Sequence, residues 1–431
     1  MIIFLSIFFL LVLLIGGLWM GVALSLAGVA VLYFGQGGTA ALSIVTMGIW
    51  NILYSFPLVA LPLFILLGEL FISFGLSVKV YNALAPLLER FSGKLLISNV
   101  ALCAVFGAAS GSSMATAAAI GSVAYPELRK KGYDKRALVG NLAGAGTLGI
   151  LVPPSIPIII YAALTNVSVG ASFVAAVIPA AVAVIMFIAF VTIQVRLKPS
   201  LVPTSTSEVV SLRQALIALH GLIPIVVLVA SVMGTIYFGI ATTTEAAALG
   251  VLAVVLISFA YRAFSFEAAA KALVGTSLIC ASIGFIMMGA MVFSMALATT
   301  GLPRTIVMVV QNWELSSFAL IMAIFALYLI LGCFFGATEM LVTTLPFTFP
   351  LVLAAGYDPV WFAVAVVILC EMGQITPPVG VNLFVLQSIT GGDATLGDVA
   401  RGAFPYFLIL GLLLMLITVF PQMTTYLPSL M

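Results

Sequence analysis

Charge is what this sequence has least of. Only 6% of its 431 residues are charged, 64% are hydrophobic, and the net charge is +2. So little charge excludes an ordinary soluble domain, and the near-neutral balance excludes an electrostatic footprint for nucleic acid. The composition is instead typical of a membrane protein with many spans.

Metal-binding and catalytic motifs are also missing. The single histidine, His220, has no partner for a metal site, and the sequence contains neither an HExxH motif nor a pair of intramembrane aspartates. These absences argue against an intramembrane enzyme, the alternative from another class of protein. The cysteines lack CxxC spacing and lie in apolar segments, which predicts packing roles for Cys103, Cys280, Cys333 and Cys370.

Two diproline segments interrupt the apolar sequence, Gly149-Ile-Leu-Val-Pro-Pro-Ser155 and Gly373-Gln-Ile-Thr-Pro-Pro-Val379. A prolyl ring removes a backbone donor and clashes with the carbonyl one turn back, so neither segment can continue a helix. In hydrocarbon, each unpaired backbone group costs several kcal/mol unless protein, water or an ion satisfies it. Two such breaks at matching places in two halves indicate the substrate and ion site of a secondary transporter.

The two breaks belong to an internal repeat that spans nearly the whole chain. One offset of 224 residues relates Pro126 to Pro350, Gly132-Tyr133-Asp134 to Gly356-Tyr357-Asp358, and Pro154 to Pro378. Nearer the start, offsets of 218 and 226 relate Trp19-Met-Gly-Val-Ala23 to Tyr237-Phe-Gly-Ile-Ala241 and Gly75-Leu76 to Gly301-Leu302. Small insertions or deletions therefore separate the repeated blocks.

Each half is predicted to contain spans, an amphipathic interfacial arm, a re-entrant hairpin with a small polar tip, a broken helix and a last span. The first half, 1–198, has its arm at 77–94, hairpin at 95–125, broken helix at 137–166 and last span at 172–197. A cytoplasmic linker, 199–214, leads to the second half, 215–431, with arm 302–314, hairpin 316–355, broken helix 360–390 and last span 402–427.

The first spans are harder to place, because the apolar segments 2–34 and 44–74 are both too long for one crossing. We expect the Gly16-Gly17 pair to divide the former into two short spans, and Pro57 and Pro62 to end or bend the latter. The N-terminus has no basic region and no convincing cleavage site, which favours a retained span over a signal peptide.

Charges at equivalent repeat positions predict the topology. No basic residue lies at the equivalent positions around the second Gly-Tyr-Asp turn. Five surround the first turn: Arg129, Lys130, Lys131, Lys135 and Arg136. By the positive-inside rule, the first turn is cytoplasmic and the second is not, so the halves form an inverted repeat. The hairpins then enter from opposite faces and meet near the midplane.

The hairpin tips and helix breaks offer hydroxyl and carbonyl oxygens, which suit a weakly held Na⁺. The first tip and break provide Ser110, Gly111, Ser112, Ser113, Thr116, Gly149 and Val152, with Asn141 on the preceding helix. The second tip and break provide Gly336, Thr338, Glu339, Gly373, Gln374, Thr376 and Asn382. No Lys or Arg lies near, so an anionic substrate would depend on helix N-terminal amides and on the ions.

Four acids lie in apolar segments, where ionisable groups are functional by default. Glu339 and Glu371 are near the second site in sequence, and Glu339 is ranked ahead of Glu371 as a functional acid; which of them carries a proton stays open. Glu69 and Glu245 are distant from both sites, and we expect packing or interfacial roles for them.

Four segments resemble the large membrane subunit of tripartite ATP-independent periplasmic (TRAP) transporters, and the resemblance runs end to end. They are Gly111-Ser-Ser-Met-Ala-Thr116, Gly144-Ala-Gly-Thr-Leu-Gly-Ile-Leu-Val-Pro-Pro-Ser-Ile-Pro157, Thr243-Thr-Glu-Ala-Ala-Ala248 and Ile375-Thr-Pro-Pro-Val-Gly-Val-Asn-Leu-Phe384. The resemblance implies Na⁺-driven uptake of a small organic acid, a carboxylate solute, across the bacterial inner membrane. It also implies an elevator mechanism, a small four-helix membrane subunit and a periplasmic substrate-binding protein.

The same resemblance implies residue roles. Sodium ligands would be Ser110, Ser112, Ser113, Gly149, Val152 and Pro153 at one site, and Gly336, Thr338, Gly373 and Thr376 at the other. Substrate contacts would be Ser112, Thr116, Asn141, Pro154, Glu339, Pro378 and Asn382. The nearest alternative is a stand-alone Na⁺/dicarboxylate symporter or antiporter of related architecture, which would need neither partner.

Overall fold

The computed structural model describes residues 8–10, 12–13, 16–80, 83, 95–203, 221–301, 305, 308 and 316–431. Every regular element among these residues is a helix. Six of the helices are long and apolar enough to cross a membrane, and one bent helix pair makes a possible seventh. The predicted all-helical, polytopic architecture is therefore confirmed at this level.

The helices of the first half follow the chain from α2 to α11. They are α2 (Met20–Gln36), α3 (Gly38–Leu53), α4 (Phe56–Ser73), α6 (Leu95–Ser110), α7 (Ser113–Lys130), α8 (Lys135–Gly146), α9 (Leu148–Leu151), α10 (Ile156–Thr165) and α11 (Val169–Leu197), followed by a 3-10 turn, Pro199–Leu201. The first diproline pair lies between α9 and α10, where the chain bends by 42°.

The second half runs from α13 to the C-terminus. Its elements are α13 (Ile223–Val229), a π-turn (Ala230–Gly234), α14 (Thr235–Tyr237), α15 (Thr243–Ala260), α16 (Phe266–Thr299), α18 (Ser317–Gly332), α19 (Ala337–Ala354), α20 (Pro359–Gln374), α21 (Val381–Ile389), α22 (Leu396–Val419), α23 (Gln422–Thr425) and a 3-10 turn, Pro428–Leu430. The second diproline pair separates α20 from α21.

The Gly-Tyr-Asp motifs stop one helix and start the next. Gly132 and Gly356 adopt positive φ angles of 87° and 80°, a conformation that ends a helix readily only with glycine. Two residues later, the Asp134 carboxylate accepts a hydrogen bond from the Ala137 amide, 2.8 Å away, and caps α8. Asp358 caps α20 in the same way through the Val360 amide at 2.7 Å.

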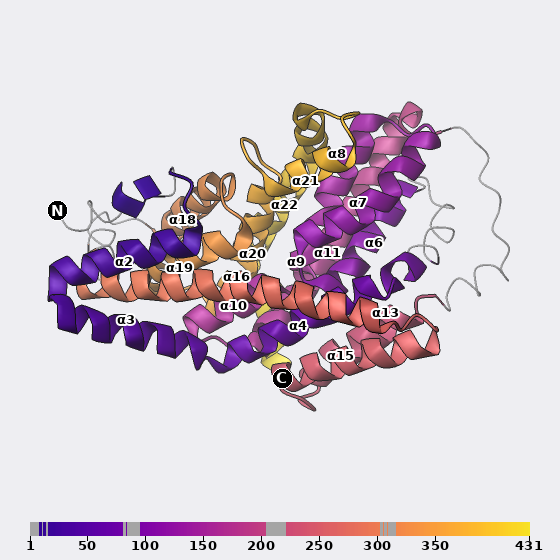
Figure 1. Ribbon diagram of the computed structural model, residues 1–431. Coiled ribbons are helices and arrows are strands. Elements are labelled where there is room, and N and C mark those ends of the chain that lie inside the picture. Colours follow the sequence, from indigo (N-terminus) through magenta and orange to yellow (C-terminus); the bar gives the residue numbers. More distant parts are fainter. Residues whose placement is uncertain are drawn as a thin grey trace.

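Helices of the two halves pack in reciprocal pairs. The 34-residue α16 lies lengthwise between α2 on one side and α3 and α4 on the other (Figure 1). In return, α15 packs against α4, while α10 contacts α19 and α21 contacts α7. The first and second halves are therefore interleaved, and neither has a separate core.

Some predicted boundaries differ from the observed helices. The segment predicted from residue 44 begins at Gly38, because Gly37 has φ 84° and α3 follows α2 without a loop. Pro57 lies in the first turn of α4, whereas Pro62 lies inside it without ending it. The last span, predicted at 402–427, is α22 at Leu396–Val419, because Thr395 and Asp398 form a capping box at its start.

Several predictions fall outside the described residues. Most of the arms at 77–94 and 302–314, residues 204–214 of the linker and His220 lie there. Near the N-terminus, Gly16 and Gly17 form a turn before α2, and residues 1–7, 11 and 14–15 are not described.

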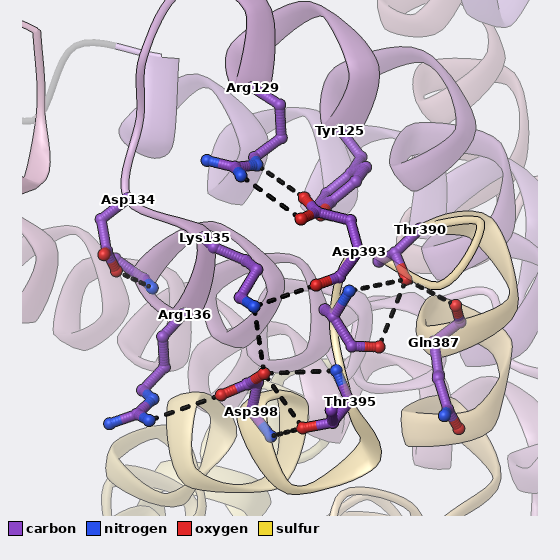
Figure 2. Close-up of polar contacts among 12 residues, drawn as sticks. Tyr125, Arg129, Asp134, Lys135, Arg136, Gln387, Thr390, Asp393, Thr395 and Asp398 are labelled. Carbon is purple, nitrogen blue, oxygen red and sulfur yellow. Dashed lines mark hydrogen bonds and ion pairs between the residues drawn. The ribbon is translucent and has the colours of Figure 1, made fainter.

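A charged cluster joins the halves where the end of α7 and the start of α8 meet the loop between α21 and α22 and the start of α22 (Figure 2). Arg129, at the end of α7, donates from Nε to the Asp393 carboxylate at 2.8 Å, and Lys135 donates to the Asp393 carbonyl at 2.9 Å. Asp393 lies in the loop between α21 and α22. The cluster therefore connects the first hairpin to the end of the second broken helix.

The Asp393 contact predicts a pH-dependent stability. The Arg129 guanidinium, assisted by the Tyr125 hydroxyl, holds the pKa of Asp393 below its ordinary value of 3.8. A depressed pKa contributes stability above the unfolded-state value, and that stability is lost as pH falls through the folded-state value. Below about pH 4, we expect the melting temperature to fall less steeply in Asp393→Asn than in the parent.

Glu127→Gln, which removes an exposed i,i+4 pair with Lys131, is the control. Identical acid profiles for parent and Asp393→Asn would contradict the assignment.

Candidate functional site

The turn between α6 and α7 is built from small polar residues. Gly111 has a φ of 59°, which allows the chain to reverse, and the Ser112 hydroxyl caps α7 by accepting from the Ala115 amide at 3.3 Å. The hydroxyls of Ser110 and Thr116 are 3.0 Å apart, and Thr116 also donates to the Ser112 carbonyl at 2.7 Å. The tip therefore concentrates hydroxyl and carbonyl oxygens.

The first helix break packs directly onto this tip. A Cβ at Gly149 would lie 2.6 Å from Thr116 Oγ1 and 2.7 Å from the Ser112 carbonyl oxygen, so only glycine fits without displacement. The Ile156 amide, at the start of α10, donates to the Gly111 carbonyl at 3.3 Å. The break and the tip, about forty residues apart in sequence, form one unit.

The second tip and break repeat this arrangement. A Cβ added at Gly373 would lie 2.6 Å from the Gly332 carbonyl carbon. In the first half, a Cβ added at Gly107 would likewise lie 2.8 Å from the Gly149 Cα atom. The amides of Val379 and Gly380 both donate to the Cys333 carbonyl at 3.2 Å. In each half, two glycines of the hairpin and the broken helix approach closely, Gly107 with Gly149 and Gly332 with Gly373; we call each pair a glycine crossing. Each half therefore joins its broken helix to its own tip through a glycine crossing and backbone hydrogen bonds.

A cavity of about 340 Å³ lies between the two tips. It is lined by Gly111, Ser112, Ser113, Met114, Ile150, Ile156, Pro157, Leu278, Ile279, Ser282, Ile283, Ile286, Gly336, Ala337, Thr338, Glu339 and Gln374. Seven of the residues listed for the predicted tips and breaks are among them: Gly111, Ser112, Ser113, Gly336, Thr338, Glu339 and Gln374. The structure thus brings residues of both predicted sites to one cavity.

The electrostatics of the cavity come mainly from the backbone. First-turn residues of α7, α10 and α19 line it, so three helix N-termini, with the positive ends of their dipoles, meet there. No Lys or Arg is among the lining residues. Glu339 supplies a negative side chain. The arrangement favours an anion only together with cations that offset Glu339 and the ligand's own charge.

Glu371, which the sequence ranks below Glu339 as a functional acid, connects the two halves. Its side chain is fully buried, and its Oε2 accepts from the Ser113 hydroxyl at 2.9 Å. The Asn382 amide donates to the same hydroxyl, so Ser113 of the first tip contacts both parts of the second broken helix. The Glu371 Oε1 and Asn382 Oδ1 atoms are buried and have no hydrogen-bond partner among the described residues.

Two other residues near the site were not in the predicted set. Ser155, after the first diproline pair, is 1% exposed, and its hydroxyl has no hydrogen-bond partner in the part of the chain that the structure describes. Ser282 brings a hydroxyl from α16. Hydroxyls within apolar segments were the available signal, but many such hydroxyls bond to their own helix and carry no information.

Other predicted residues lie away from the cavity lining. The Asn141 amide is bonded to Asn99 and Tyr406, each at 3.0 Å, in the contact between α6, α8 and α22. Val152 and Pro153 line a separate apolar cavity of about 600 Å³ beside α11 and α13. Pro154, Pro378, Gly373 and Thr376 do not line the cavity between the tips either. Their substrate and sodium roles stay predictions.

The distant acids have the environments of structural groups. Glu245 is exposed and completes a capping box with Thr242 at the start of α15. Glu69 of α4 is close to Gly275 of α16, where a Cβ would lie 3.0 Å from Glu69 Oε2. Neither is among the residues that line the cavity between the tips.

The fold and the cavity define a multi-pass membrane transport protein. The sequence matches the family described as "Tripartite ATP-independent periplasmic transporter, DctM component" over residues 7–423. The chain belongs to this family of TRAP transporter large permeases.

Relatives of known name agree with this assignment. The chain is 33% identical over 377 residues to the C4-dicarboxylate TRAP transporter large permease protein DctM of Pseudomonas aeruginosa, covering 87% of this chain and 86% of that protein. It is 31% identical to the sialic acid TRAP transporter large permease protein SiaM of Vibrio cholerae, covering 87% of each. These relatives are transport permeases and not enzymes.

The fold is shared with a more distant transporter. The crystal structure of the Alcanivorax borkumensis YdaH transporter superposes with a TM-score of 0.64 at 14% identity, covering 92% of this chain and 89% of that one. At this identity, the likeness concerns the fold alone.

Proposed function

We propose that this permease carries out Na⁺-coupled uptake of a small organic acid across the bacterial inner membrane. The observation that carries the proposal is the cavity between the tips, where three helix N-termini meet hydroxyl groups without an arginine or lysine. Relatives named for C4-dicarboxylate and sialic acid support a carboxylate-bearing solute.

Sodium would be cargo that moves with the solute. The Ser110, Ser112 and Thr116 oxygens at the first tip, and the Thr338 and Thr376 hydroxyls of the second half, are donors of the type that hard cations take. The ions would offset the charge of the carboxylate and of Glu339, which makes solute binding depend on Na⁺. The buried, unpartnered oxygens of Ser155, Glu371 and Asn382 add to the oxygen donors of the region.

We infer that the two halves are an inverted repeat and that hairpins and broken helices move together as an elevator against the remaining helices. The glycine crossings and the reciprocal contacts of α7 with α21 and of α10 with α19 support a compact moving body. The tripartite family supports two partners, a periplasmic substrate-binding protein and a small membrane subunit. It disfavours the stand-alone symporter or antiporter.

Reconstitution tests the function. In liposomes that hold this chain with the cognate small subunit, uptake of a radiolabelled carboxylate should require both an inward Na⁺ gradient and the substrate-binding protein. The solute is first chosen by thermal melting of the binding protein against a carboxylate panel. Uptake by this chain alone, or uptake indifferent to Na⁺, would overturn the proposal.

Removing one predicted ligand hydroxyl should weaken Na⁺ binding. In Ser112→Ala or Thr376→Ala, we expect the Na⁺ concentration for half-maximal uptake to rise about fivefold, because one lost polar contact is worth roughly 1 kcal/mol. The Thr376 hydroxyl donates to the Met372 carbonyl at 2.6 Å, which leaves its oxygen free to accept or ligate.

Matched controls separate this effect from helix packing. Thr192→Ala removes a similar hydroxyl, bonded to the Ile188 carbonyl of α11 at 2.7 Å, and Ser277→Ala removes one bonded to the Leu273 carbonyl of α16 at 2.8 Å. Both should retain the parent's sodium dependence. If the site variants also retain it, the sodium assignment is wrong.

A further inference from the structure

A second polar cavity, of about 520 Å³, lies beside the charged cluster and shares Lys135, Arg136 and Asp398 with it. It is bounded by the start of α8, the end of α11 and the start of α22. Part of its wall is visible in Figure 2, where Lys135 and Arg136 converge on Asp398. The cavity is therefore shared by the first half, through α8 and α11, and the second, through α22.

The described residues of this cavity do not balance its charge. Among them, four cations and two acids line it: Lys135, Arg136, Lys198, Arg401, Asp134 and Asp398. Both acids are already engaged, Asp134 as the cap of α8 and Asp398 with Lys135 and Arg136, each at 3.4 Å. The side chains of Lys198 and Arg401 form no hydrogen bond or ion pair with any described residue, so two cationic groups remain available to an anion.

Exposed apolar side chains lie next to the basic residues on both α22 and α11. On α22, Phe404, Leu408 and Leu412 follow Arg401 at helical spacing and are 57%, 55% and 55% exposed. On α11, Ile193 and Leu197 precede Lys198 and are also exposed. A ligand with an anionic head and an apolar tail would satisfy both regions, whereas a free anion would leave the apolar side chains uncovered.

We propose that this cavity binds the phosphate headgroup of an anionic phospholipid, with its acyl chains along α11 and α22. Basic pockets between membrane helices at the cytoplasmic face have the chemistry for such headgroups, and the basic residues place this cavity on that face. Arg401 and Lys198 hold the phosphate from opposite sides of the cavity. The bound lipid bridges the two halves close to the Asp398 ion pairs.

The experiment uses the purified full-length chain in a neutral detergent. Phosphatidylglycerol, phosphatidylcholine or inorganic phosphate is added, and lipid retention is measured by native mass spectrometry together with the melting temperature. We expect only phosphatidylglycerol to be retained and to raise the melting temperature. Affinity for phosphatidylglycerol should fall about thirtyfold in the double variant Lys198→Gln/Arg401→Gln, at about fivefold for each cation.

The control removes two charges elsewhere. Lys130→Gln/Arg262→Gln has the same net charge as the test variant, and neither residue lines the cavity. It should retain the parent's affinity. Equal losses in both variants, equal stabilisation by phosphatidylcholine, or full stabilisation by inorganic phosphate would each overturn the proposal, since they would indicate general surface charge, any lipid, or a soluble anion.

Discussion

Replacing Gly149 with alanine is expected to lower the rate of Na⁺-coupled uptake about 100-fold, because small displacements of a binding site can cost that much. The new Cβ would lie 2.7 Å from the Ser112 carbonyl oxygen and 2.8 Å from Ser113 Cα, both backbone atoms that cannot rotate away. The first break would be pushed off the first tip, which separates the oxygens proposed to hold sodium. Initial rates in proteoliposomes measure the effect.

The matched control for Gly149→Ala is Gly284→Ala in α16, where an added Cβ meets no atom within 4 Å. It should transport normally. Gly373→Ala should behave like Gly149→Ala, because the added Cβ would meet the Gly332 backbone. Normal uptake by both crossing variants would show that contact between break and tip is not needed for transport.

Replacing Glu371 is expected to affect stability and transport separately. Glu371→Ala leaves a cavity and removes one of the two acceptors of the Ser113 hydroxyl, the other being the Gly146 carbonyl at 3.1 Å. Together these changes destabilise by about 3 kcal/mol. Glu371→Gln keeps the volume and can still accept from Ser113, so it should fold. We expect its uptake to fall at least about tenfold, because a carboxylate buried at membrane depth is functional by default.

Melting temperature and initial uptake rate, measured on the same preparations, distinguish the two effects. Glu245→Gln is the control, because this exposed residue only caps α15 and glutamine can serve the same role. Parent-like uptake by Glu371→Gln would show that Glu371 is a packing residue. The hydroxyls of the tips would then bind sodium without a contribution from the Glu371 carboxylate.

The sequence predicted the parts of the site more securely than their arrangement. Both diproline segments separate helices, and the Gly-Tyr-Asp motifs end and begin helices, because these effects depend on backbone chemistry within a few residues. The limits of α3 and α22 were less accurate. They depend on the left-handed Gly37 and on the Thr395–Asp398 capping box, which a hydrophobicity pattern does not register.

Composition, helix breaks and the repeat were determined by the sequence alone, because each is set by local chemistry or by comparison of the chain with itself. The tertiary structure decided which residues share a cavity. Ser113 and Glu371 are 258 residues apart, yet their side chains are hydrogen-bonded, whereas Asn141 is occupied by Asn99 and Tyr406. It also placed α16 as a wall of the cavity. Which face of an almost uniformly apolar helix turns inward depends on neighbours distant in sequence, and a sequence with so little polar contrast does not mark that face.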